Sequence, residues 1–138
     1  MNRSFWIAWL QAVLALLFVY ALVLVFAGSV AGSVFSALGF GPPSPVDSGG
    51  VGAYLKLPFM VLGAVLAGWS LMMIQIGRGP LRDGSAWALP ILVRSLALWF
   101  VLDTGMSLVL GFPAHALFNV PFALALGIPL WMLKSRSG

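Results

Sequence analysis

Residues 5–26 read FWIAWLQAVLALLFVYALVLVF and contain one strongly polar side chain, that of Gln11. A helix needs about 20 predominantly apolar residues to cross roughly 30 Å of hydrocarbon, and this run is long enough. Arg3 precedes the run, as in a secretory signal peptide, but the apolar part of a signal peptide spans only about 7–15 residues. We therefore expect residues 5–26 to form a retained membrane-spanning helix.

Three further apolar runs follow, and they cover about residues 57–76, 86–110 and 114–133. The composition agrees, since 62% of the residues are apolar and only 7% are charged, far outside the range of a soluble domain. We predict an all-α fold: a polytopic membrane protein with a single domain, residues 1–138, that forms a bundle of four transmembrane helices.

Basic side chains mark one side of this expected bundle. Arg3 precedes the first run, Arg78 and Arg82 lie between the second and third, and Lys134 and Arg136 follow the fourth. An excess of Lys and Arg indicates the cytoplasmic side, so we expect cytoplasmic N and C termini in the cell inner (plasma) membrane. No basic stripe with interleaved aromatics accompanies the net charge of +4, so we expect the lipid bilayer as a partner and no nucleic acid.

Prolines and glycines divide the apolar runs. Residues 27–40 are apolar and uncharged, so they either extend the first helix or form a short interfacial helix. Residues 41–45, Gly-Pro-Pro-Ser-Pro, then end any helix, because proline lacks an N–H donor and restricts the preceding residue. Pro90, Pro121 and Pro129 lie inside the third and fourth runs, where we expect kinks and freed backbone carbonyls.

The third run carries two charged residues, Arg94 and Asp103. Insertion scales assign either charge a cost of about 2.5–3.5 kcal/mol at the centre of a membrane helix, so each is rarely retained without a partner. At about 100° per residue, their separation in sequence places them on opposite faces of the helix. They are therefore not an ion pair within one helix, and we expect each to contact a different neighbour.

A polar cluster is expected around Asp103, in the outer half of the predicted bundle. The short connection Gly111-Phe112-Pro113 folds the fourth run back as an antiparallel hairpin. Counting equal steps from this turn places Asp103 level with Asn119 and Ser107 near the depth of His115. The candidate ion-binding or ligand-binding residues are Asp103, Thr104, Ser107, His115 and Asn119.

Three roles remain open for this cluster. Its side chains can hydrogen-bond across helices as a structural contact, or they can form a binding site or a path for ions or protons. Ser107, His115 and Asp103 also contain the elements of a nucleophile, a base and an orienting acid, but no Gly-x-Ser-x-Gly turn accompanies them. With one His, no Cys and no Glu, the chain cannot fill a zinc ligand set, so we expect no metal site.

Arg94 is expected in the inner half of the bundle. Counting depth offers Gln11, Ser70 and Gln75 as hydrogen-bond partners, and none of them is acidic. Carbonyls freed near Pro90, snorkelling, a partner chain, or an anionic lipid or ligand could each stabilise the guanidinium. This shortage of acidic partners favours a homo-oligomer or a larger membrane complex.

The sequence also resembles a known group. The stretch from Gly79-Pro80-Leu81-Arg82 through Trp99-Phe100-x-x-Asp103-Thr104-x-x-Ser107 to His115-Ala116-x-x-Asn119 is similar to a group of small, uncharacterised bacterial four-helix membrane proteins. The resemblance covers roughly the last three runs. It implies the four-helix fold and no activity.

These observations lead to one expected function and two alternatives. We expect a small integral inner-membrane protein that acts as an oligomeric or accessory subunit of a membrane assembly. The first alternative is a small transporter, channel or lipophilic-ligand-binding protein that uses the intramembrane Asp, His and Asn cluster. The second is an intramembrane enzyme. The sequence names no cofactor.

Overall fold

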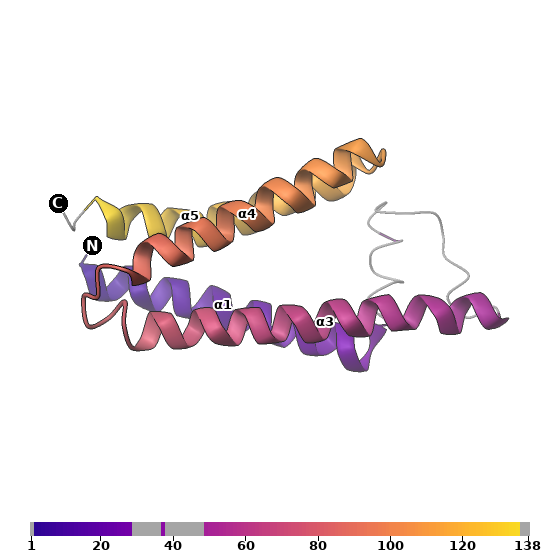
Figure 1. Ribbon diagram of the computed structural model, residues 1–138, viewed down its shortest axis with the longest axis horizontal. Coiled ribbons are helices and arrows are strands. Elements are labelled where there is room, and N and C mark those ends of the chain that lie inside the picture. Colours follow the sequence, from indigo (N-terminus) through magenta and orange to yellow (C-terminus); the bar gives the residue numbers. More distant parts are fainter. Residues whose placement is uncertain (1, 29–36, 38–48, 136–138) are drawn as a thin grey trace. The chain divides into compact units, whose positions relative to one another are not determined.

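The computed structural model describes residues 2–28, 37 and 49–135, the last range without the side chains of residues 49–56. The described ranges form an all-α chain and contain no strand. Their helices, shown in Figure 1, are α1 (Arg3–Phe26), α3 (Gly49–Arg78), α4 (Ala88–Val109) and α5 (Pro113–Lys134). The two alternatives for residues 27–40 fall almost entirely outside the described residues.

Every one of these helices contains a stretch long and apolar enough to cross a membrane. The stretches are Arg3–Phe26, Leu57–Arg78, Ala88–Val109 and Pro113–Lys134. The structure therefore confirms the four helices that the apolar runs predict, with differences at their ends.

α1 and α3 begin before the expected residues, for identifiable reasons. α1 begins at Arg3 because the Asn2 side-chain oxygen accepts the backbone N–H of Phe5 at 3.0 Å, which is an N-terminal cap. α3 begins at Gly49, well before the expected residue 57, and runs through Pro58. Proline removes a single helical hydrogen bond, and here this loss does not end the helix.

The helices belong to two compact units. Unit 1 comprises Met1–Ala15 and Leu71–Gly138, and unit 2 comprises Leu16–Ser70. α1 and α3 contribute to both units, whereas α4 and α5 belong to unit 1 alone. In unit 1, the start of α1, the α3–α4 connection and the end of α5 lie at the same end (Figure 1).

Arg3 joins the start of α1 to the α3–α4 connection in unit 1. Its guanidinium donates to the backbone oxygens of Leu81 at 2.6 Å and Arg82 at 3.1 Å. Leu81 is buried beneath this contact. Gly84 completes the connection at a φ of 81°, a conformation that glycine adopts without steric cost. The sequence predicts a role for Arg3 in orientation and does not predict this contact.

The prolines of α4 and α5 act differently from one another. Pro90 lies in the first turn of α4, where helical N–H groups have no partner in any case. The expected interruption of the helix at Pro90 therefore does not occur. Pro129 lies inside α5 and leaves the Ala125 carbonyl without its helical donor. The Trp9 indole N–H from α1 donates to that carbonyl at 3.0 Å. This long-range contact satisfies a carbonyl that the proline frees.

Unit 2 consists mainly of the second half of α1 and the first part of α3. They approach closely at Gly63: a Cβ atom there would lie 2.7 Å from the Ala21 carbonyl oxygen and 2.9 Å from the Leu24 Cβ. Small residues allow such backbone approach between apolar helices. Gly68, on the same helix, has open space around it.

Candidate functional site

The candidate site lies on the hairpin of α4 and α5. Gly111 ends α4 at a φ of 79°, and the backbone N–H groups of Gly111 and Phe112 donate to the carbonyls of Leu108 and Ser107. This pattern is the Schellman motif that closes many helices with glycine. Pro113 then begins α5 at a position where its missing N–H is of no consequence. Local sequence thus accounts for the turn that brings the two helices together.

Asn119 of α5 is the centre of the cluster. Its side chain is 3% exposed, and its amide nitrogen donates to the Asp103 Oδ2 at 3.0 Å and to the Thr104 hydroxyl oxygen at 3.2 Å. One amide group carries two N–H donors, so it can make both bonds. The structure therefore confirms the predicted level pairing of Asp103 with Asn119.

His115 contacts the other oxygen of the same carboxylate. Its Nε2 lies 3.5 Å from the Asp103 Oδ1, and this contact is an ion pair only when the imidazole is protonated. The two side chains are 33% and 38% exposed, respectively. One oxygen of Asp103 is therefore held by a buried amide, while the other lies beside an accessible imidazole.

The Ser107 hydroxyl bonds to the backbone of its own helix. It is buried, and its hydroxyl donates to the Asp103 backbone oxygen at 2.6 Å, one turn earlier in α4. A serine nucleophile needs its hydroxyl hydrogen directed to a base. The observed bond directs that hydrogen to the helix backbone, so the geometry gives no support to the enzyme alternative.

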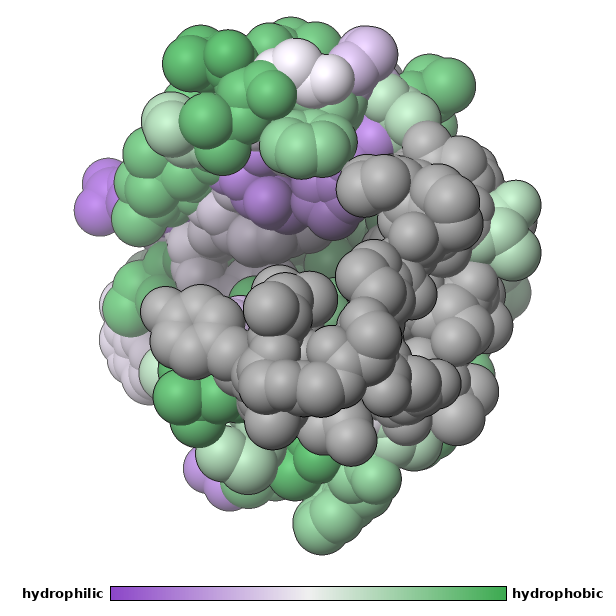
Figure 2. Space-filling view, turned by 90° about the vertical axis from the view of Figure 1, so that its right-hand side faces the viewer, coloured by the Kyte–Doolittle hydropathy of each residue, from purple (hydrophilic) through white to green (hydrophobic). Residues whose placement is uncertain are grey.

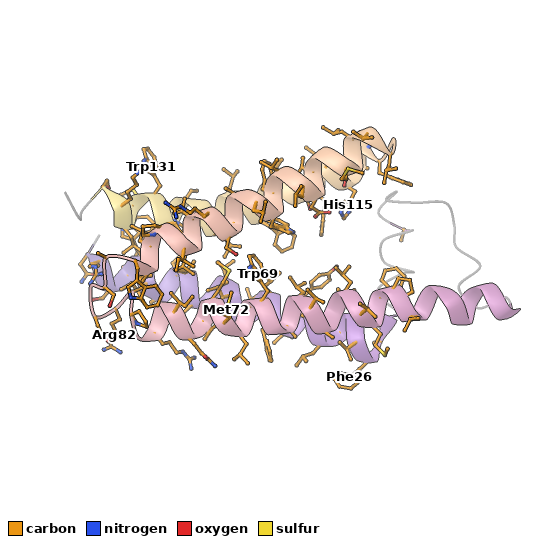
Figure 3. The ribbon with its side chains drawn as sticks, viewed as in Figure 1. Phe26, Trp69, Met72, Arg82, His115 and Trp131 are labelled. Carbon is orange, nitrogen blue, oxygen red and sulfur yellow. The ribbon has the colours of Figure 1, made fainter. Side chains whose placement is uncertain are left out.

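Aromatic rings continue along α5 from His115. The His115 imidazole stacks on Phe118, with ring centroids 6.5 Å apart and planes inclined by 29°. Phe118 meets Phe122 edge to face at 5.1 Å. Figure 3 shows His115 near the turn of the hairpin, and in Figure 2 hydrophilic surface gathers on the hairpin among apolar residues. His115, the neighbour of the Asp103 carboxylate, thus lies beside an apolar aromatic surface.

The second predicted cluster, around Arg94, is not formed by the described residues. The Gln11 amide donates to the Ile74 backbone oxygen at 3.2 Å, and the Ser70 hydroxyl donates to the Ala67 oxygen of its own helix at 3.1 Å. Gln75 is exposed, and Arg94 is exposed as well. The expected hydrogen bonds between Arg94 and these polar side chains are therefore absent from the described part of the chain.

No group of three or more His, Cys, Asp or Glu side chains that could hold a metal ion occurs among residues 2–28, 37 and 49–135. Comparison of the chain with protein-family models, with curated proteins and with solved structures finds no match. The contacts on the hairpin are therefore the basis for any functional assignment.

Proposed function

We propose that the chain is a multi-pass protein of the cell inner (plasma) membrane, with both termini and the α3–α4 connection on the cytoplasmic side. Four long apolar helices support insertion. The basic residues Arg3, Arg78, Arg82 and Lys134 support the orientation, because they flank the helices at the end of unit 1 where the termini lie.

We further propose that Asp103 and His115 form a binding site for a proton or a cation, as in a small transporter. The observation that carries this proposal is that the two oxygens of the Asp103 carboxylate have different contacts. The buried amide of Asn119 donates to Oδ2, whereas Oδ1 lies 3.5 Å from His115, and the Asp103 and His115 side chains are partly exposed. A 3.5 Å contact is longer than a good hydrogen bond, so a ligand can compete for Oδ1.

The neighbouring rings suit a lipophilic cation. Phe118 stacks on His115, the neighbour of the carboxylate, and Phe122 meets Phe118; aromatic faces attract cations. A cation bound at Oδ1 would compete with His115 for the carboxylate.

Asp103→Asn tests this proposal in proteoliposomes. Asparagine keeps an oxygen acceptor for Asn119 and removes the negative charge, so the protein should fold while flux is lost. The measurements are gradient-driven proton flux, followed with a pH-sensitive dye, and uptake of tetraphenylphosphonium. Asp83→Asn is the matched control, because Asp83 is exposed in the α3–α4 connection. If Asp103→Asn unfolds the protein, or leaves both fluxes at the wild-type rate, the cluster is a structural contact.

A second candidate function is that of a subunit in a homo-oligomer or larger membrane assembly. Gly105 on α4 favours this second candidate, because a Cβ atom at that position would have no neighbour within 4 Å. Glycine on an open helix face permits a close helix–helix contact. Extraction in mild detergent should then give a particle much larger than one chain, and Gly105→Leu should reduce its size while Gly105→Ala does not. A monodisperse wild-type monomer contradicts this candidate.

A further inference from the structure

Arg94 projects from α4 on the side away from α5. It lies nine residues before Asp103, which corresponds to about half a turn around the helix axis. Asp103 contacts Asn119 of α5, so the opposite face, with Arg94, is turned away from the hairpin partner. Burial agrees, since Leu92 and Leu96 are buried while Leu98 and Val101 are 63% and 65% exposed.

The position of Arg94 along α4 allows its guanidinium to reach the end of the helix. Arg94 lies six residues after Ala88, the first residue of α4, or about 9 Å along the axis. The Cα–Cβ bonds of a helix tilt toward its N-terminus, which here is the nearer end. The long arginine stem can therefore lie along the apolar surface while its charge approaches the membrane interface.

Trp87 lies at that interface on the same face. It precedes Arg94 by seven residues, or nearly two full turns, so the two side chains are aligned along the helix. Trp87 is 50% exposed and adjoins the first residue of α4. Indoles prefer the head-group level of a membrane, with their N–H toward polar groups.

The chain offers no carboxylate to Arg94 within the described residues. Asp103 lies on the opposite face of α4, and Asp83 forms no ion pair with Arg94. A second copy in the same orientation would bring its own Arg94, and not an acid, to this depth. Within the described residues the guanidinium therefore meets no carboxylate, and an anion of another molecule can bind it.

We propose that Arg94 and Trp87 form a binding site for the phosphate of an anionic phospholipid, in the leaflet where α4 begins. A guanidinium matches a phosphate with two parallel hydrogen bonds. The exposed apolar residues Leu98 and Val101 offer a path for the acyl chains. The proposal rests on membrane insertion, and it is independent of the role of Asp103.

Native mass spectrometry of the full-length protein tests this site. Wild-type protein in mild detergent is titrated with phosphatidylglycerol, with phosphatidylcholine and with inorganic phosphate. We expect wild-type protein to retain phosphatidylglycerol in preference to phosphatidylcholine, and Arg94→Gln to weaken that binding about tenfold, the effect of losing a charge-assisted hydrogen bond. Arg94→Lys should weaken it less. Arg82→Gln is the control, because it removes an equal charge from an exposed site at the same end.

Several results would overturn the site. Equal losses in Arg94→Gln and Arg82→Gln would indicate general charge attraction, and competition by inorganic phosphate at equal concentration would indicate an anion site without a lipid. If Arg94→Gln instead releases a copurifying protein and leaves lipid binding unchanged, the guanidinium contacts a protein partner. Asp103→Asn should leave lipid binding at the wild-type level, which separates this test from that of the proposed function.

Discussion

Arg94 and Asp103 lie in the same helix and carry opposite charges, yet the structure treats them differently. Asp103 receives contacts from two side chains of α5, Asn119 and His115. Arg94 is exposed on the opposite face, without a hydrogen bond or ion pair of its side chain to any described residue. One charge is stabilised by a neighbouring helix, and the other is directed outward.

The geometry of α4 explains this difference. Arg94 lies six residues from the beginning of α4, and Asp103 lies six residues from its end at Val109. The tilt of helical side chains toward the N-terminus carries Arg94 toward its nearer end and Asp103 away from its nearer end. The aspartate side chain is also short. Asp103 therefore needs a partner at its own depth, whereas Arg94 can reach the interface.

Asn119→Ala should give the largest change in stability, because it removes the donor that serves Asp103 and Thr104. We expect the free energy of unfolding to fall by about 2–3 kcal/mol, since it leaves a carboxylate without its buried donor. Urea or sodium dodecyl sulfate titration followed by tryptophan fluorescence measures it. In an Asp103→Ala background the same substitution should cost less than half as much. Equal costs in both backgrounds would show that the two residues are not coupled.

Trp9→Phe tests the hydrogen bond from the Trp9 indole to the Ala125 carbonyl, an uncharged group at the other end of the hairpin. We expect a loss of about 1 kcal/mol, because the Ala125 carbonyl loses the indole donor. Pro129→Ala supplies that carbonyl with a helical N–H, so Trp9→Phe should cost less in this background. The same cycle of unfolding titrations measures both values. An unchanged cost would mean that the proline does not create the need for Trp9.

Arg94→Gln should have the smallest effect on stability. In detergent without added lipid we expect a change within about 0.5 kcal/mol, because the side chain is exposed and has no partner in the described chain. Thermal unfolding followed by circular dichroism measures it. A loss above about 2 kcal/mol would show that Arg94 is held by a group of its own chain, and the contrast with Asp103 would then disappear.

Much of this arrangement could be predicted from local patterns in the sequence. The lengths of the apolar runs predicted the four helices. Counting residues equally in both directions from the turn at Gly111 predicted that Asp103 lies level with Asn119, because the rise per residue is the same in two paired antiparallel helices. The bond of the Ser107 hydroxyl to the Asp103 backbone could not be predicted, because the serine rotamer decides between the helix carbonyl and a neighbour.

Contacts between segments that are distant in the sequence also could not be predicted from the sequence patterns. The contacts of Trp9 with Ala125 and of Gln11 with Ile74 depend on how the helices are rotated about their axes. The proline four residues after Ala125 is a signal for a free carbonyl, but it does not identify the donor. The extension of α3 to Gly49 was missed because the boundary near residue 57 was taken from the apolar run alone, and α3 begins before that run.

The most direct test of the contrast uses the only histidine of the chain, His115. A ¹⁵N magnetic resonance spectrum of histidine-labelled protein in lipid contains a single imidazole. We expect Asp103→Asn to shift the Nε2 resonance, because that nitrogen loses its anionic neighbour, and Arg94→Gln to leave it unchanged. An Nε2 resonance that ignores Asp103→Asn, or that responds equally to both substitutions, would contradict the assignment of the two charges to opposite faces of α4.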